Sequence, residues 1–384
     1  MDKRSLWLYI ARATGAGAGI VVHFFFARIG GLEGYGLLSL FLNLNLFLSY
    51  IADFGFSLNG PRLLLNDASG QLAHVGQYVR TRLALLTALL FVVLVYTLYP
   101  TQASVLLWGL PMIVLYGLQA DWIHRGSARP DLAAYRQMAQ STGQLLLVAA
   151  VWYFEGSLAL ALALYAAIAG ITFIWSYPRW PHKPLQAQSV PKLLREQGRV
   201  LLGMLLYFGS YNIVIPLLTY LEGAELTGFY ASHYFLCTSL GTLSVITMEV
   251  FMAKSKEESA SYGKWMLLFT GFAVVGIGLS YWYFPLIFGN KGFYWDGWLT
   301  LIFAGICVVH ALRLYWVNGL LFSLRQRHYL QYSRNAFLFH LLLIGGWLFL
   351  GNQYTAMAAA LILLIAETLP LLYFGLKQRR PDVA

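Results

Sequence analysis

A small set of polar residues interrupts the long apolar stretches of this chain, and these residues could bind charged ligands or carry protons. Ionisable groups inside a membrane are costly, so they usually face the interior of a helix bundle or a water-filled cavity. There an arginine offers a positive charge, acids and imidazoles are candidate proton sites, and amides form hydrogen bonds. In chain order the set is Arg12, His23, Asn43, Asn45, Asp53, Asp121, Asn212, Glu249, His310, Arg313, Asn318 and Glu367.

The two arginines of this set differ in the depth at which we expect them. Arg12 lies early in the first apolar stretch, so it could either extend to lipid headgroups or line a cavity. Arg313 lies near the middle of its stretch and cannot easily reach headgroups, which favours a functional or ion-paired role. His310 precedes Arg313 by three residues, so we expect both side chains on one face of a helix.

The acids leave two interpretations open. Asp53 could be a structural partner of Arg12 or Arg62, or it could bind a coupling ion. Asp121 lies near the end of its stretch, where solvation or a salt bridge with a basic loop residue is the simpler expectation. Glu367 lies nearer mid-stretch, and it is either a packing acid or a second ion-coupling candidate.

The composition predicts the elements that must position these residues. Of 384 residues, 59% are hydrophobic and 11% are charged, whereas soluble domains have about 25% charged residues. The chain is therefore expected to be an all-α protein that crosses the membrane many times. Its two cysteines, Cys237 and Cys307, both lie inside apolar stretches and indicate neither a disulfide framework nor a metal site.

The apolar stretches predict about twelve transmembrane helices, because roughly 20 residues cross the hydrocarbon core. They lie near 6–27, 35–57, 81–100, 104–124, 137–154, 157–177, 200–221, 227–252, 265–288, 297–322, 336–350 and 353–376. Most of the 26 basic residues then fall in segments on one side, which the positive-inside rule assigns to the cytoplasm. Both termini are therefore expected in the cytoplasm, and the net charge of +10 reports topology rather than a nucleic-acid partner.

The longest loop divides the chain almost in half. It carries four prolines, Pro178, Pro181, Pro184 and Pro191, and then a basic amphipathic segment. We expect an N-terminal six-helix bundle at 1–178, a cytoplasmic linker at 179–199 and a C-terminal six-helix bundle at 200–384. Parallel repeats of this kind are a common plan among transporters.

The loops exclude several classes of function. The largest outer loop, 289–296, is too short to hold a domain. The sequence contains no Ser-His-Asp arrangement, no metal-ligand spacing and no P-loop, so we expect no catalytic residues, no metal, no cofactor and no ATP hydrolysis. Any activity is expected among the helices.

The stretch 50–62, YIADFGFSLNGPR, resembles a signature of the Wzx-type flippases, the polysaccharide transporter branch of the MOP (MATE-like) superfamily. The resemblance rests on Asp53, an aromatic residue, Gly55 and Phe56, followed by Arg62. Further stretches are similar in order and spacing. They are Gly30–Gly36, Asp121-Trp122 with Gly126, the element Thr227-Gly228-Phe229-Tyr230, Gly289 with Tyr294-Trp295, and Ile365-Ala366-Glu367. One departure is that the proline-arginine pair usual near residues 251–254 is replaced by Phe-Met-Ala-Lys.

The resemblance implies two rocking bundles that move an undecaprenyl-pyrophosphate-linked oligosaccharide to the outer leaflet of a bacterial inner membrane. The expected partners are this lipid-linked substrate, membrane lipids and a polysaccharide polymerase. Arg12 and Arg313 would bind the phosphates, with His310, Asn43 and Asn212 as polar groups of the cavity. The alternatives are a multidrug or cation exporter of the same superfamily and a membrane polymerase or acyltransferase. Two deep arginines disfavour the exporter, and the short outer loops disfavour the enzyme.

Overall fold

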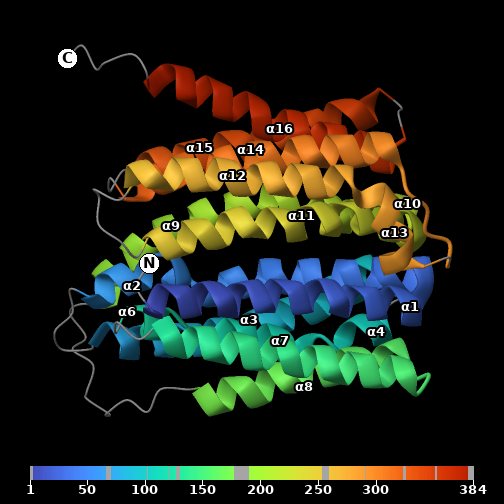
Figure 1. Cartoon of the computed structure of the whole chain (residues 1–384). Coiled ribbons are helices and arrows are strands. Elements are labelled where there is room, and N and C mark those ends of the chain that lie inside the picture. Colours follow the sequence, from blue (N-terminus) through green and yellow to red (C-terminus); the bar gives the residue numbers. More distant parts are fainter. Residues whose placement is uncertain are drawn as a thin grey trace. The chain divides into compact units, whose positions relative to one another are not determined.

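The computed structural model describes residues 3–65, 71–101, 103–119, 121–126, 130–176, 190–252, 259–289, 291–322, 326–350 and 353–378, in some helical stretches by the backbone alone. Every regular element in these ranges is an α-helix (Figure 1). The all-helical class expected from the sequence therefore holds for the described residues. The chain divides into two compact units, Met1–Leu205 and Leu206–Ala384.

The first unit is arranged around its longest helix, α1, which contacts α3, α5 and α7. The helix α8 in turn contacts α5 and α7. The elements are α1 (Lys3–Asp53), α2 (Phe56–Leu65), α3 (Gln71–Leu98), α4 (Ala103–Leu107), α5 (Leu110–Leu118), α6 (Asp121–Gly126), α7 (Pro130–Tyr153), α8 (Leu158–Ser176) and the first part of α9 (Val190–Asn212). The span expected at 104–124 is thus broken into α4, α5 and α6. The expected linker begins within 177–189, outside the described residues, and from Val190 the chain is helical.

The helix α1 turns back on itself at Gly31, whose φ of 63° and ψ of −164° are not helical. His23 Nδ1 and the hydroxyl of Tyr35 lie 2.9 Å apart, whereas twelve residues of a straight helix span about 18 Å. Such a backbone conformation is open to glycine almost alone. The glycine-rich stretch 30–36 is therefore the turn that separates the two spans expected at 6–27 and 35–57.

In the second unit, α14 contacts α11, α12, α15 and α16, so it is the central helix of this unit. The elements are the last part of α9, α10 (Val214–Glu222), α11 (Ala224–Met252), α12 (Ser259–Gly278), α13 (Ser280–Phe288), α14 (Gly297–Phe322), α15 (Gln326–Phe349) and α16 (Ala356–Gln378). The position of α14 explains how Arg313, on this helix, comes to lie inside the unit.

Two of the expected spans are bent. The helices α9 and α10 meet at 41°, and α12 and α13 meet at 70°. Pro216 explains the first bend, because it has no N–H to donate to the carbonyl of Asn212. Pro285 likewise lies inside α13, just after the second break.

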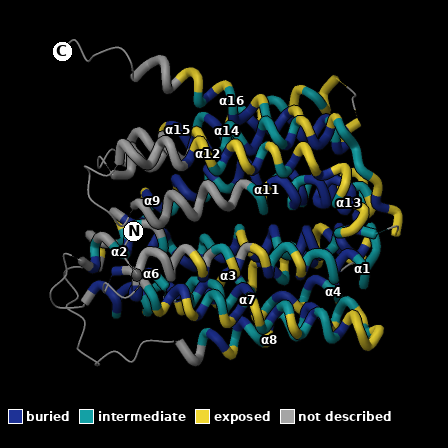
Figure 2. The backbone as a smooth tube through the Cα atoms, in the orientation of Figure 1, coloured by how far each residue is buried: buried dark blue, intermediate teal, exposed yellow. Residues whose placement is uncertain are grey.

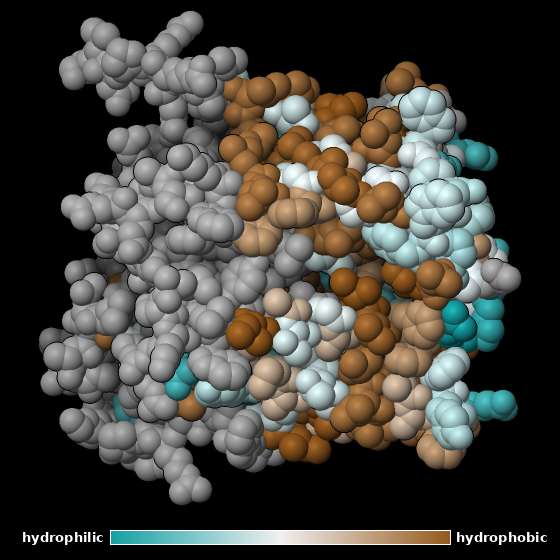
Figure 3. Space-filling model, in the orientation of Figure 1, coloured by the Kyte–Doolittle hydropathy of each residue, from teal (hydrophilic) through white to brown (hydrophobic). Residues whose placement is uncertain are grey.

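Apolar residues lie on the outside of the helices as well as in their interior. Figure 2 marks the exposed and the buried residues along each helix. On α3, Leu85, Leu86 and Leu89 are each more than 60% exposed. Figure 3 shows that the described surface of one face is largely hydrophobic, with polar residues gathered toward one end of the helices. Exposed apolar surface of this extent is expected where helices face lipid.

The number of spans expected from the sequence stays a prediction. By length and composition, four stretches of the described residues could cross a membrane, or up to six if each bent pair is one span. The cytoplasmic location of both termini and the division at 178–200 also stay predictions.

The turn at Gly31 gives a test of the fold. Gly31→Ala forces a Cβ into a glycine-only conformation, so we expect it to destabilise the protein by about 1–3 kcal/mol. Gly17→Ala is the matched control, because a Cβ at Gly17 meets no atom within 4 Å. Thermal unfolding of the purified variants in detergent measures the difference, and equal midpoints for both variants would contradict the assignment of the turn.

Candidate functional site

The candidate site of the second unit is an ion pair between Arg313 of α14 and Glu367 of α16. Arg313 Nη1 contacts the carboxylate oxygen Oε2 of Glu367, and both residues are 0% exposed. The arginine therefore faces neither lipid nor water. A buried pair of this kind is costly to desolvate, and removing one partner leaves an uncompensated charge.

Aromatic rings surround the guanidinium of Arg313. Its Cζ atom lies 3.5 Å from the ring centre of Tyr207, 4.7 Å from that of Tyr211 and 5.7 Å from that of Tyr332. A cation over a ring face is stabilised by about 2 kcal/mol or more when it is desolvated. The rings thus offset part of the cost of burying the arginine.

Neutral polar groups complete this site. The hydroxyl of Ser210 lies 3.2 Å from Glu367 Oε1 and 2.8 Å from the carbonyl oxygen of Tyr207, and it can donate its single proton to either of them. The hydroxyl of Tyr211 lies 2.8 Å from His310 Nδ1. The site therefore combines one cation, one anion, an imidazole and several hydroxyl-bearing rings, which together could bind an anionic ligand that also carries sugars.

A second group of charged residues, in the first unit, holds the elbow between α1 and α2. Phe54 has a φ of 53° and Gly55 a φ of 77°, so the helix is interrupted and the chain bends over these two residues. Asp53 fixes the start of α2: its carboxylate accepts from the backbone N–H of Ser57 at 2.8 Å and from the Ser57 hydroxyl at 2.7 Å. The aspartate of the signature thus caps a helix.

The same carboxylate is ion-paired. Arg80 Nη2 of α3 lies 3.2 Å from Asp53 Oδ1, and both side chains are less than 10% exposed. Arg80 Nε also donates to the carbonyl of Gly117 in α5 at 2.8 Å. Arg80 precedes the span expected at 81–100, yet it lies inside α3, because that helix begins ten residues before the span.

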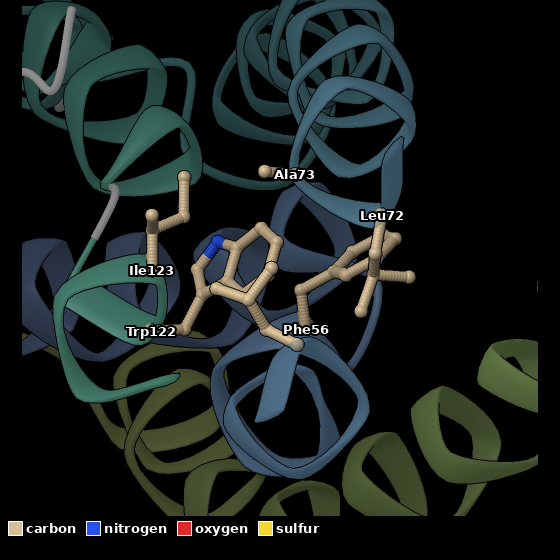
Figure 4. Close-up of a cluster of buried hydrophobic side chains, with 6 residues drawn as sticks. Phe56, Leu72, Ala73, Trp122 and Ile123 are labelled. Carbon is tan, nitrogen blue, oxygen red and sulfur yellow. The ribbon is translucent and has the colours of Figure 1, made fainter. Parts of the chain in front are cut away.

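Phe56 of the signature belongs to a buried apolar cluster with Trp122 (Figure 4). Their ring centres lie 5.3 Å apart. Glycines bring the backbones close to the indole, since a Cβ at Gly60 would lie 2.5 Å from Trp122 Cε3 and one at Gly76 would lie 2.8 Å from Trp122 Cζ2. Two of the quoted stretches, 50–62 and 121–126, are therefore packed together.

Gly55 has a packing role besides its backbone conformation. A Cβ at this position would lie 3.2 Å from the backbone nitrogen of Leu201 and 3.3 Å from Val200 Cγ1, both in α9. Only a glycine lets the elbow approach the α9 backbone so closely. The elbow thus anchors the first part of the helix whose last part carries Tyr207, Ser210 and Tyr211.

Asp121 takes part in a third buried network. Its carboxylate accepts two bonds from Arg136 of α7, one of them from Nε at 2.7 Å. Arg136 Nη1 donates to Gln140 at 2.6 Å, and Gln140 donates to the hydroxyl of Tyr116 at 3.0 Å. The salt bridge expected for Asp121 is present, although its partner lies in a helix rather than in a loop.

The remaining predicted residues do not join these groups. Asn43 is buried in α1, Asn212 donates from its amide to the carbonyl of Phe208 at 2.8 Å, and Gly228 is buried in α11. The side chains of Arg12 and Arg62 lie outside the described residues. Among the residues that the structure describes, the predicted cavity and coupling residues His310, Arg313 and Glu367 lie together in one group.

Sequence reasoning missed several members of the second-unit site. Tyr207 and Tyr211 were not among the predicted cavity residues; the sequence left open whether such tyrosines form an interfacial belt or stack on sugars, and both are less than 10% exposed. Their spacing with Ser210 places all three on one face of α9, which is the signal that could have found them. Tyr332 of α15 carries no such signal, because only the packing of α15 brings it near Arg313.

The chain resembles known proteins both in sequence and in fold. The model of the family described as "Polysaccharide biosynthesis protein" matches residues 3–256. This chain belongs to that family. The resemblance stated from the sequence is confirmed at this level. Among curated proteins, the comparison finds no match.

Several solved transporters share the fold. An outward-facing multidrug resistance MATE family transporter of the MOP superfamily is 12% identical with a TM-score of 0.61, covering 98% of this chain and 95% of its own. A MOP superfamily transporter from Pyrococcus furiosus is 13% identical with a TM-score of 0.60, covering 98% and 95%. The lipid II flippase MurJ is 15% identical with a TM-score of 0.60, covering 97% and 87%. The chain therefore has the fold of MOP superfamily transporters.

The ion pair at the elbow gives a test of the site in the first unit. Asp53→Asn leaves Arg80 buried beside a neutral amide, so we expect a loss of about 3–5 kcal/mol in stability. The double variant Asp53→Asn with Arg80→Met should lose less than the sum of the single losses, by about 0.5–3 kcal/mol.

Ser57→Ala is the control, because it removes one hydrogen bond and keeps the ion pair. We expect it to cost about 1 kcal/mol. Unfolding in detergent measures Asp53→Asn, Arg80→Met, the double variant and Ser57→Ala, and additive losses would show that Asp53 and Arg80 do not interact.

Proposed function

We propose that this polysaccharide-family protein is a flippase that moves an undecaprenyl-pyrophosphate-linked oligosaccharide from the cytoplasmic to the periplasmic leaflet. Family membership and the MOP transporter fold support a membrane transporter. The observation that carries the finer proposal is the arginine at the centre of the second unit, with tyrosine rings around it. A pyrophosphate needs such a cation to leave water, and sugars pack well against aromatic rings.

The mechanism that fits these parts is alternating access. The headgroup would enter from the cytoplasm, exchange its water for Arg313 and the surrounding hydroxyls, and leave toward the periplasm when the bundles rock. The polyprenyl chain would stay in lipid throughout. Arg12, Asn43 and Asn212 remain proposed members of the path, and an ion gradient acting through Asp53 or Glu367 remains a proposed driving force.

The runner-up is a multidrug or cation exporter, which the MATE structures among the neighbours favour. Such a protein needs an acid that is available to a cationic drug. Here Glu367 is already neutralised by Arg313, which argues for an anionic cargo. A membrane polymerase or acyltransferase of the same pathway is the third candidate, and a polymerase is also a proposed partner of the flippase in a bacterial inner membrane.

Replacement of Arg313 tests the proposal. Arg313→Ala should stop the export of surface polysaccharide in a host that depends on this protein. Arg313→Lys should restore part of it, because lysine keeps the positive charge but lacks the planar guanidinium group that binds a phosphate through two hydrogen bonds. Arg334→Ala is the control, since Arg334 is an exposed arginine of α15. Polysaccharide on the cell surface and protein level in the membrane are measured together. Normal polysaccharide with the alanine variant would remove Arg313 from the path.

A transport assay separates the flippase from the exporter. Vesicles containing the purified protein should bring a labelled undecaprenyl-pyrophosphate-linked oligosaccharide to the opposite leaflet, and they should not accumulate ethidium. Ethidium transport without movement of the lipid would favour the exporter instead.

A further inference from the structure

The carboxylate of Glu367 occupies a position on Arg313 that a phosphate oxygen would use. Carboxylate and phosphate are bound by guanidinium through the same donors and in the same bidentate geometry. In this structure the carboxylate already holds that position, with neither residue exposed. A pyrophosphate that reaches Arg313 must therefore compete with an anion that belongs to the protein itself.

Charge decides what happens to Glu367 in that competition. With the carboxylate ionised, a bound pyrophosphate would add excess negative charge to an apolar interior, which is strongly unfavourable. A displaced carboxylate that stays in the interior is neutralised by taking up a proton. Ser210 can support either form, because its hydroxyl both donates and accepts hydrogen bonds.

We propose that Glu367 is a displaceable internal counter-ion of Arg313, so that binding of a pyrophosphate headgroup is linked to uptake of one proton from water by Glu367. The inference rests on the proposed function, and it adds how the ion pair forms again after the headgroup has left. When the headgroup leaves, Glu367 loses the proton and pairs again with Arg313. The empty protein then never buries an unpaired cation.

Other titratable groups around the pair must be considered as the source of any proton. Within the described helices of the second unit, those that interact electrostatically with Arg313 are Tyr207 and Tyr211 of α9, Tyr234 of α11, His310 of α14, and Tyr332 and His340 of α15. The acid of α10, Glu222, is exposed. The histidines are therefore the groups from which the effect of Glu367 must be separated, and a variant of Glu367 alone does this.

The test uses the full-length protein in lipid nanodiscs and farnesyl pyrophosphate as the probe. Calorimetry in buffers of different ionisation enthalpy gives both the affinity and the number of protons taken up. Glu367→Gln keeps the size of the side chain and can hydrogen-bond to Arg313 and Ser210, but it leaves the arginine without a buried anion, so we expect a less stable protein. Thermal unfolding in the nanodiscs shows whether the variant is folded. The proton uptake of the wild type tests the inference without the variant, and binding with no proton uptake would overturn it. Glu225→Gln is the control, since Glu225 is an exposed acid of α11.

The wild type and Glu225→Gln should take up about one proton more per probe than Glu367→Gln does. At mildly alkaline pH, Glu367→Gln should bind the probe about tenfold more tightly, because no carboxylate competes. The affinity of the wild type for farnesyl pyrophosphate should increase as the pH falls. In Glu367→Gln the affinity should depend on pH only as far as the probe itself takes up protons. Inorganic pyrophosphate, tested in parallel, should show the same proton difference with weaker binding if the lipid chain contributes to affinity.

Equal affinity and equal proton uptake in the wild type and Glu367→Gln would overturn the inference. If Arg313→Gln nevertheless abolished binding of the probe, the proposed function would stand although the inference about Glu367 would not. Unchanged binding in Arg313→Gln would instead overturn both, because the probe would not use this site.

Discussion

A guanidinium inside an apolar helical unit has to be neutralised and hydrogen-bonded, and this constraint organises the second unit. Arg313 can remain at the centre of α14 because Glu367, the ring of Tyr207 and the neighbouring hydroxyls are brought to it from other helices. Each of these helices has to be correctly placed for the charge to be tolerated. The pair thus links α14 to α16, and the aromatic contact links both to α9.

In the first unit the corresponding constraint is a tight bend of the chain. The elbow at Phe54 and Gly55 requires left-handed backbone conformations, and Asp53 stabilises it by capping α2 and pairing with Arg80. Each of these signature residues therefore has its own structural role: Asp53 caps α2 and binds Arg80, and Gly55 adopts the positive φ that the bend requires. Gly55 also lets the elbow meet α9, so the signature positions a helix that continues into the second unit.

The sequence predicted the helical class and the family, and it placed Arg313 and Glu367 among the helices, because apolar length and isolated charges are local properties; the depth of both residues in a membrane stays a prediction. It predicted the face shared by His310 and Arg313 for the same reason. It did not predict that Arg313 pairs with Glu367 or that Asp53 pairs with Arg80, since such pairs depend on packing between helices. The apolar stretch also begins after Arg80, although the helix α3 begins before it, because the charge ends the apolar stretch without ending the helix.

The central claim is that a lipid-linked pyrophosphate passes beside Arg313 inside the second unit. Photo-crosslinking tests it most directly, with a photoreactive amino acid placed at His310, one turn from Arg313, or at Leu301, an exposed position of the same helix. The account predicts that labelled lipid-linked oligosaccharide is captured from position 310 and that Arg313→Ala abolishes the capture. Capture from Leu301 alone, unaffected by Arg313, would contradict it.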